Sequence, residues 1–179
     1  MCIRDRKTLE VIDDFFVPND YLNVVRYCSE ADYYWGERDD NKFAPTGMVH
    51  EIYDCEDTPV KESNQWIYDL FLENTNHLCP NLKLYRMYIN SFAPGENPYF
   101  HTDSLNGEDI TFLYYVPSAD WDINDGGETQ FYYNGDMIGV MPVPNRMVYF
   151  DATILHKATS FRDRWRWTVA IKFSKTKGW

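Results

Sequence analysis

The chain has 179 residues, which is enough for one domain with a substantial buried core. Its formal net charge is −11, and such an acidic chain argues against a nucleic-acid partner, because phosphate binding needs a basic face. The basic residues gather after position 143, where 8 lysines and arginines stand against 2 acidic residues. That end either surrounds a small anion or forms an ordinary solvated surface.

The sequence has no signal peptide and no apolar run of transmembrane length, so no membrane partner is expected. The four cysteines form neither a C-x-x-C motif nor a dense framework, which predicts a reduced, cytoplasmic protein. Residues 1–6, Met-Cys-Ile-Arg-Asp-Arg, resemble translated adaptor sequence and are interpreted as a non-native or disordered leader. The predicted domain therefore covers residues 7–179.

The first part of the chain predicts one strand and two helices. Residues 8–16 favour a strand, and residues 20–30 carry an apolar stripe at helical spacing. Residues 33–57 are polar and irregular, which indicates either a lid over a site or a surface excursion. Thr58 and Pro59 are then typical of a helix start, and the second helix is expected to end near Cys79.

After Pro80 the apolar period changes from helical to strand-like. Turn signals such as Ala93-Pro94-Gly95 and Asn134-Gly135 separate short β-branched and aromatic runs. The predicted strands cover residues 82–92, 110–116, 127–133, 137–141, 146–150, 154–160 and 166–174. Helices followed by many short strands predict a mainly β fold with flanking N-terminal helices, of the jelly-roll kind.

His101 and Asp103 form a possible metal-binding pair. Residues two apart on a strand point to the same face, so an imidazole and a carboxylate can approach one ion from a single short segment. A second histidine would complete the facial triad typical of non-haem Fe(II) oxygenases, and His156 is the candidate. His50 and His77 have no such context and are expected to be structural or exposed.

Six motifs have a characteristic order and spacing, and they lie at residues 99–103, 111–115, 126–131, 147–150, 156 and 166–168. Together they resemble those of 2-oxoglutarate/Fe(II) oxygenases of the prolyl 4-hydroxylase-like kind, closest to versions from marine phages and bacteria. The resemblance covers residues 82–172, and phage origin would place the protein in a bacterial host cell.

The resemblance implies a double-stranded β-helix that holds Fe(II) through His101, Asp103 and His156. It implies that 2-oxoglutarate and O2 are co-substrates, that Arg166 binds the far carboxylate and that Thr168 adds a hydroxyl donor; it also leaves room for ascorbate. Related halogenases lack the carboxylate ligand, so Asp103 favours hydroxylation of an unactivated C–H bond. Arg164 shares the strand face of Arg166 and is its rival for the carboxylate.

In one place the sequence departs from the family. A tyrosine usually lies about nine residues before the first histidine, where this chain has Phe92. Tyr88, or one of Tyr114 and Tyr115, would have to supply the missing hydroxyl to 2-oxoglutarate.

Three readings of the function remain open. A prolyl residue in a peptide or protein is the expected substrate by analogy. A free amino acid or another small metabolite is the alternative. A catalytically inactive jelly-roll binding domain is a reading of a different class.

Overall fold

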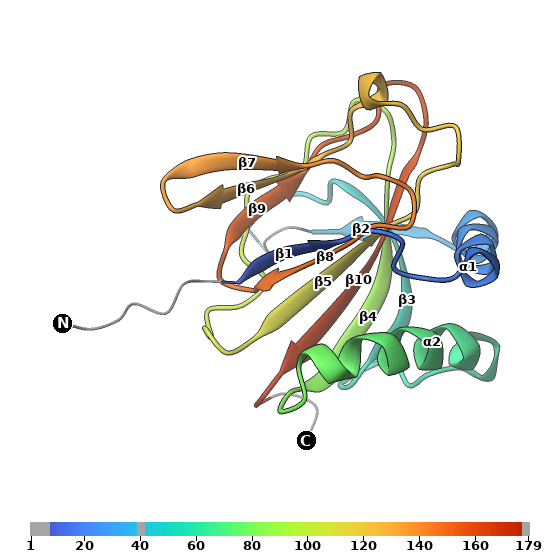
Figure 1. Cartoon of the computed structure of the whole chain (residues 1–179), viewed down its shortest axis with the longest axis vertical. Coiled ribbons are helices and arrows are strands. Elements are labelled where there is room, and N and C mark those ends of the chain that lie inside the picture. Colours follow the sequence, from blue (N-terminus) through green and yellow to red (C-terminus); the bar gives the residue numbers. More distant parts are fainter. Residues whose placement is uncertain (1–7, 39–41, 177–179) are drawn as a thin grey trace.

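The computed structural model describes residues 8–38 and 42–176, so the leader proposed at residues 1–6 lies outside the described residues. The described chain forms ten strands and two α-helices (Figure 1). The elements are β1 (Leu9–Ile12), α1 (Pro18–Glu30), β2 (Tyr34–Glu37), β3 (Gly47–Asp54), α2 (Gln65–Thr75), β4 (Lys83–Phe92), β5 (Ile110–Tyr115), β6 (Thr129–Tyr133), β7 (Asp136–Val140), β8 (Met147–Asp151), β9 (Leu155–Ala158) and β10 (Arg166–Ser174).

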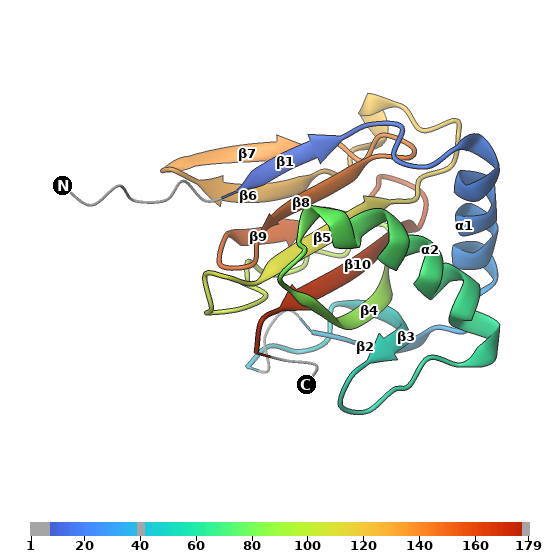
Figure 2. The same ribbon diagram turned by 60° about the horizontal axis from the view of Figure 1, so that its bottom comes forward.

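The strands form two antiparallel sheets. The large sheet has the order β1-β8-β5-β10-β4-β3-β2, and the small sheet has the order β7-β6-β9. Figure 1 shows the small sheet on one side of the large sheet, and Figure 2 shows α2 in front of β5 and β10 of the large sheet. The mainly β fold with two N-terminal helices confirms the predicted fold class.

Strand β10 lies in the middle of the large sheet and is buried on both faces. Val169, Ile171 and Phe173 point into the cluster that packs against the two helices. Ala170 points the other way, into the cluster between the sheets. Because side chains alternate along a strand, residues 166, 168 and 172 share the inner face with Ala170. These inner positions are where the polar side chains of β10 occur.

The turn before β8 ties the N-terminal segment to the core. Asn145 has a left-handed backbone with φ of 62°, which asparagine tolerates better than most residues. Its side chain accepts hydrogen bonds from the Phe16 amide at 2.9 Å and the Tyr114 hydroxyl at 2.7 Å. It also donates to the Phe16 carbonyl at 2.7 Å. This buried side chain therefore connects β5, the β8 turn and the segment that leads into α1.

Two expectations about the N-terminal half were wrong. The polar segment 33–57 contains β2 and β3, since Val49 and Ile52 bury their side chains in the sheet despite the polar residues around them. Thr58 does not cap a helix but pairs with Asp54, and α2 begins only at Gln65 after a short 3₁₀ turn.

The cysteines at 28, 55 and 79 are free thiols. Within the described ranges, no helix is long and apolar enough to span a membrane.

Candidate active site

The two candidate histidines are held side by side by the backbone. His101 and His156 exchange amide-to-carbonyl hydrogen bonds of 3.0 and 2.9 Å. His156 lies on β9, but His101 forms only an isolated bridge and Asp103 lies in the connection that follows. The expectation that residues 101–103 form a regular strand was therefore wrong. A hydrogen bond of 2.9 Å from the Asp103 amide to the Ala152 carbonyl holds the carboxylate beside the histidines instead.

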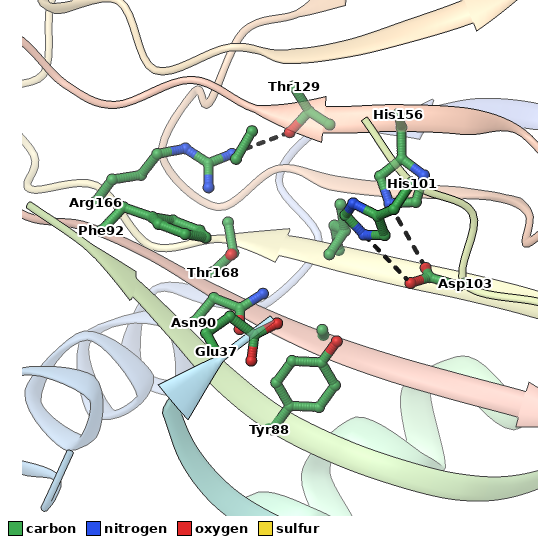
Figure 3. A pocket seen from close by; sticks show the side chains of 13 residues that line it. Glu37, Tyr88, Asn90, Phe92, His101, Asp103, Thr129, His156, Arg166 and Thr168 are labelled. Atoms are coloured by element: carbon green, nitrogen blue, oxygen red, sulfur yellow. Dashed lines mark hydrogen bonds and ion pairs between the residues drawn. The ribbon is translucent and has the colours of Figure 1, made fainter. Parts of the chain in front are cut away.

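Asp103 lies beside both imidazoles (Figure 3). Its Oδ1 is 3.6 Å from His101 Nε2, and its Oδ2 is 3.6 Å from His156 Nε2. One ligand atom from each of the three residues lies within 4.8 Å of the others, a spacing that one metal ion can bridge. The structure thus brings together the three residues that the sequence analysis proposed as metal ligands.

Both histidines present the same nitrogen to this cluster. The Nδ1 of His101 lies 3.1 Å from the Tyr99 carbonyl, and the Nδ1 of His156 lies 2.9 Å from the Ile154 carbonyl. A carbonyl can only accept, so each Nδ1 carries the proton and each Nε2 lone pair points toward Asp103. Burial lowers the pKa of His156 to about 4, which keeps its ring neutral. Two neutral imidazoles and one carboxylate fit Fe(II).

Two donors orient the carboxylate of Asp103. The Thr111 hydroxyl donates to Oδ2 at 2.7 Å, and the Lys172 ammonium donates to Oδ1 at 2.8 Å. Burial alone would raise the pKa of Asp103, but the positive charge of Lys172 holds that pKa well below its usual range. Asp103 is therefore ionised and ready to bind a cation.

Arg166 lies in the same cavity as the three candidate ligands and is only 1% exposed. Its Nε donates to the Gly127 carbonyl at 2.8 Å, and its Nη2 donates to the Thr129 hydroxyl at 3.0 Å. Among the described residues no carboxylate lies within ion-pair distance, and burial lowers the pKa of Arg166 to about 10. Figure 3 shows Nη1 directed into the cavity. A buried cation without an acidic partner predicts an anionic ligand.

Gly127 is shaped to support this arginine. Its φ of 85° is a backbone conformation that residues other than glycine rarely adopt. A Cβ atom there would lie 2.1 Å from the ring of Phe161. The Gly126-Gly127 pair therefore does more than turn the chain, because the Gly127 carbonyl that holds Arg166 depends on this backbone.

Some of the remaining predicted site residues line the cavity and others do not. Thr168 and Tyr88 line the cavity with Arg166. Tyr114 does not, because its hydroxyl is bound to Asn145 on the helix side of the sheet. The hydroxyl of Tyr115 is bound to Thr129 at 2.8 Å. Of the three alternatives to the missing tyrosine, Tyr88 is the one with a hydroxyl at the cavity.

Arg164, the rival of Arg166, points away from the cavity. It forms ion pairs with Asp120 at 2.9 Å and with Asp125 at 3.7 Å, and about a third of its side chain is exposed. Asp120 and Asp125 both lie in the connection before β6. Because Arg164 lies before the first residue of β10, the alternation that governs the strand does not apply to it.

A family model described as the 2OG-Fe(II) oxygenase superfamily matches residues 85–173, about half of the chain. This segment contains the two histidines, the aspartate and the arginine of the cavity. The chain belongs to the 2OG-Fe(II) oxygenase superfamily. Family membership and the donor set together imply Fe(II) and 2-oxoglutarate as the cofactor and co-substrate of this enzyme. Among curated proteins, none matches the chain.

Solved structures of other oxygenases share the fold at low identity. A prolyl-4-hydroxylase from Pseudomonas putida is 17% identical with a TM-score of 0.66, and the match covers 94% of this chain and 93% of that one. A viral collagen prolyl hydroxylase from Paramecium Bursaria Chlorella virus-1 is 15% identical with a TM-score of 0.60, covering 96% and 98%. HygX from Streptomyces hygroscopicus, solved with nickel and 2-oxoglutarate, is 12% identical with a TM-score of 0.67, covering 99% and 87%.

Sequence reasoning missed three polar residues at the oxygenase site. Glu37 and Asn90 line the cavity, and Lys172 contacts Asp103. Asn90 and Lys172 were open to prediction, because they share strand faces with Tyr88 and Arg166, respectively. Glu37 gave no such signal, since β2 was not predicted at all. The polar segment that contains it does border the site, and its Phe43 ring stacks on Tyr99 with a centroid distance of 4.0 Å.

Proposed function

We propose that this oxygenase is a 2-oxoglutarate- and Fe(II)-dependent dioxygenase that hydroxylates an unactivated C–H bond. The observation that carries this proposal is Arg166, a fully buried guanidinium without an acidic partner among the described residues. It faces the same cavity as three residues suited to hold Fe(II). A dianionic co-substrate satisfies both ends of this cavity, because one carboxylate neutralises the arginine and the other binds the metal.

Each residue then has a defined task. His101, Asp103 and His156 would hold the metal. When bound, Fe(II) and 2-oxoglutarate supply the activation of O2 that oxidises the C–H bond. Arg166 binds the far carboxylate through Nη1, and Thr168 and Tyr88 line the same cavity. Burial of this region excludes water and strengthens those contacts.

The substrate proposed first is a prolyl residue in a peptide or protein. The support is the fold-level likeness to prolyl hydroxylases, together with the complete set of candidate ligands that includes Asp103. A free amino acid is the second candidate. It is favoured by a cavity of about 450 Å³ that adjoins Asp103 and is lined by charges of both signs, among them Asp54, Arg86 and Lys172. A zwitterion suits such a lining.

The test is turnover under Fe(II), 2-oxoglutarate and O2. We expect succinate to form in the wild type, and we expect one oxygen atom to be added to one member of a panel of proline-containing peptides and free amino acids. Mass spectrometry of the panel decides between the two substrate classes. Absence of succinate in every mixture, with metal bound, would support an inactive binding domain instead.

A further inference from the structure

A buried lysine shares the carboxylate that the metal is expected to use. Lys172 is 8% exposed, and its Nζ lies 2.8 Å from Asp103 Oδ1 and 5.2 Å from the ring centre of Tyr88. A buried ammonium is costly unless it is paired, and Asp103 is its ion-pair partner among the described residues. One carboxylate therefore serves two cations, the lysine and the metal.

The arrangement gives each oxygen of Asp103 a separate set of neighbours. Oδ1 accepts from Lys172 and lies beside His101, whereas Oδ2 accepts from Thr111 and lies beside His156. Lys172 and Thr111 stand directly opposite each other on β10 and β5, so the large sheet itself aligns the two donors. The carboxylate cannot rotate without breaking one of these hydrogen bonds. Both donors orient the ligand, but only Lys172 adds a charge.

The positive charge of Lys172 opposes the binding of a divalent metal ion. Without a metal ion, the positive charge of Lys172 neutralises Asp103. When a divalent ion binds, the ion and the ammonium lie on the same carboxylate and repel each other through a water-poor region, where charges are weakly screened. A neutral donor such as Thr111 orients the carboxylate without this repulsion.

We propose that Lys172 is a positioning residue that orients Asp103 and, by its charge, holds the affinity for divalent metal below that of the same site with a neutral donor. The inference depends on the metal site of the proposed function. It goes beyond that function because it concerns how tightly the site holds its ion. A purely structural role for Lys172 predicts the opposite sign, since loss of an orienting contact weakens metal binding.

The test is calorimetric titration of the metal-free full chain with Mn(II), repeated with Fe(II) under anaerobic conditions. Lys172→Met and Lys172→Gln remove the charge, and Gln keeps an N–H donor of similar reach. We expect both variants to bind metal more tightly by about tenfold or more, the scale on which groups bonded to a metal ligand usually act. Lys172→Arg keeps the charge and is expected to bind like the wild type.

Two controls complete the design. Lys175→Met removes a lysine that pairs with Glu108 at the surface, and it should leave the metal affinity unchanged. Thr111→Val removes the neutral donor to Asp103 and should weaken binding. Metal-free Lys172→Met should also melt at a lower temperature than the wild type and gain more from added Mn(II), because tighter binding to the folded state stabilises it more.

The outcomes separate this inference from the proposed function. Equal or weaker metal binding in both charge-removing variants overturns the inference and leaves the metal site standing. If Lys172→Met does not fold, Lys172→Gln decides alone. A wild type that binds neither Mn(II) nor Fe(II) overturns the proposed metal site, and the inference with it.

Discussion

Replacement of Arg166 by alanine tests the co-substrate site. The guanidinium is fully buried, so its ion pair with a bound carboxylate would form away from water. Loss of one partner of such a pair typically costs about 3–5 kcal/mol. Since 1.4 kcal/mol corresponds to a factor of ten, 2-oxoglutarate should bind the Arg166→Ala variant about 140- to 4,000-fold more weakly than it binds the wild type.

The assay is calorimetric titration of the Mn(II)-loaded protein with two ligands. 2-Oxovalerate has the chain length of 2-oxoglutarate but ends in a methyl group, so it lacks the carboxylate that Arg166 is expected to bind. The variant should lose most of the difference in affinity between the two ligands. Arg164→Ala is the matched control, because that side chain pairs with Asp120 at the surface and should change neither affinity by more than a few fold.

Arg166→Ala also removes two hydrogen bonds, to Gly127 and Thr129, and these concern the fold itself. Thermal unfolding without ligand measures that loss separately. The reasoning is refuted if the variant loses affinity for 2-oxoglutarate and 2-oxovalerate by equal factors, since the far carboxylate would then not bind Arg166. A larger effect from Arg164→Ala than from Arg166→Ala would show that Arg164 binds the far carboxylate.

Three further predictions concern the metal and the fold. His156→Ala should abolish stoichiometric Fe(II) binding, measured by anaerobic titration, while His50→Ala and His77→Ala should leave it intact. Unchanged stoichiometry in His156→Ala would show that His156 is not a metal ligand. Asn145→Ala should lower the free energy of unfolding by about 2–4 kcal/mol in urea titrations, because its three buried partners lose their hydrogen bonds. Gly127→Ala should cost about 1–3 kcal/mol through backbone strain and should weaken 2-oxoglutarate binding; a neutral effect on both would show that the backbone before β6 adapts freely.

The cluster of candidate metal ligands could be predicted because short sequence spacings mark its members. His101 and Asp103 stand two apart, and the expected second histidine is followed ten residues later by an arginine. These residues lie close together even though residues 101–103 do not form a regular strand. Backbone hydrogen bonds to Ala152 and His156 achieve the convergence that a strand was expected to provide.

Other features depend on contacts that no local pattern reports. Strands β2 and β3 were missed because Glu37, Glu51 and Asp54 make the segment look like a loop, and yet Arg86 on β4 pairs with Glu51 and Asp54 across the sheet. The contact between Lys172 and Asp103 joins residues 69 positions apart. Alternation along β10 places Lys172 on the inner face, but only the folded chain brings the connection after β4 to it.

The most direct test of the account is a crystal structure of the protein grown anaerobically with Mn(II) and 2-oxoglutarate. The account predicts one metal ion bound to Nε2 of His101, a carboxylate oxygen of Asp103 and Nε2 of His156. It also predicts the far carboxylate of 2-oxoglutarate within hydrogen-bond distance of Nη1 of Arg166. A metal ion bound elsewhere, or a co-substrate whose far carboxylate lies away from Arg166, would contradict it.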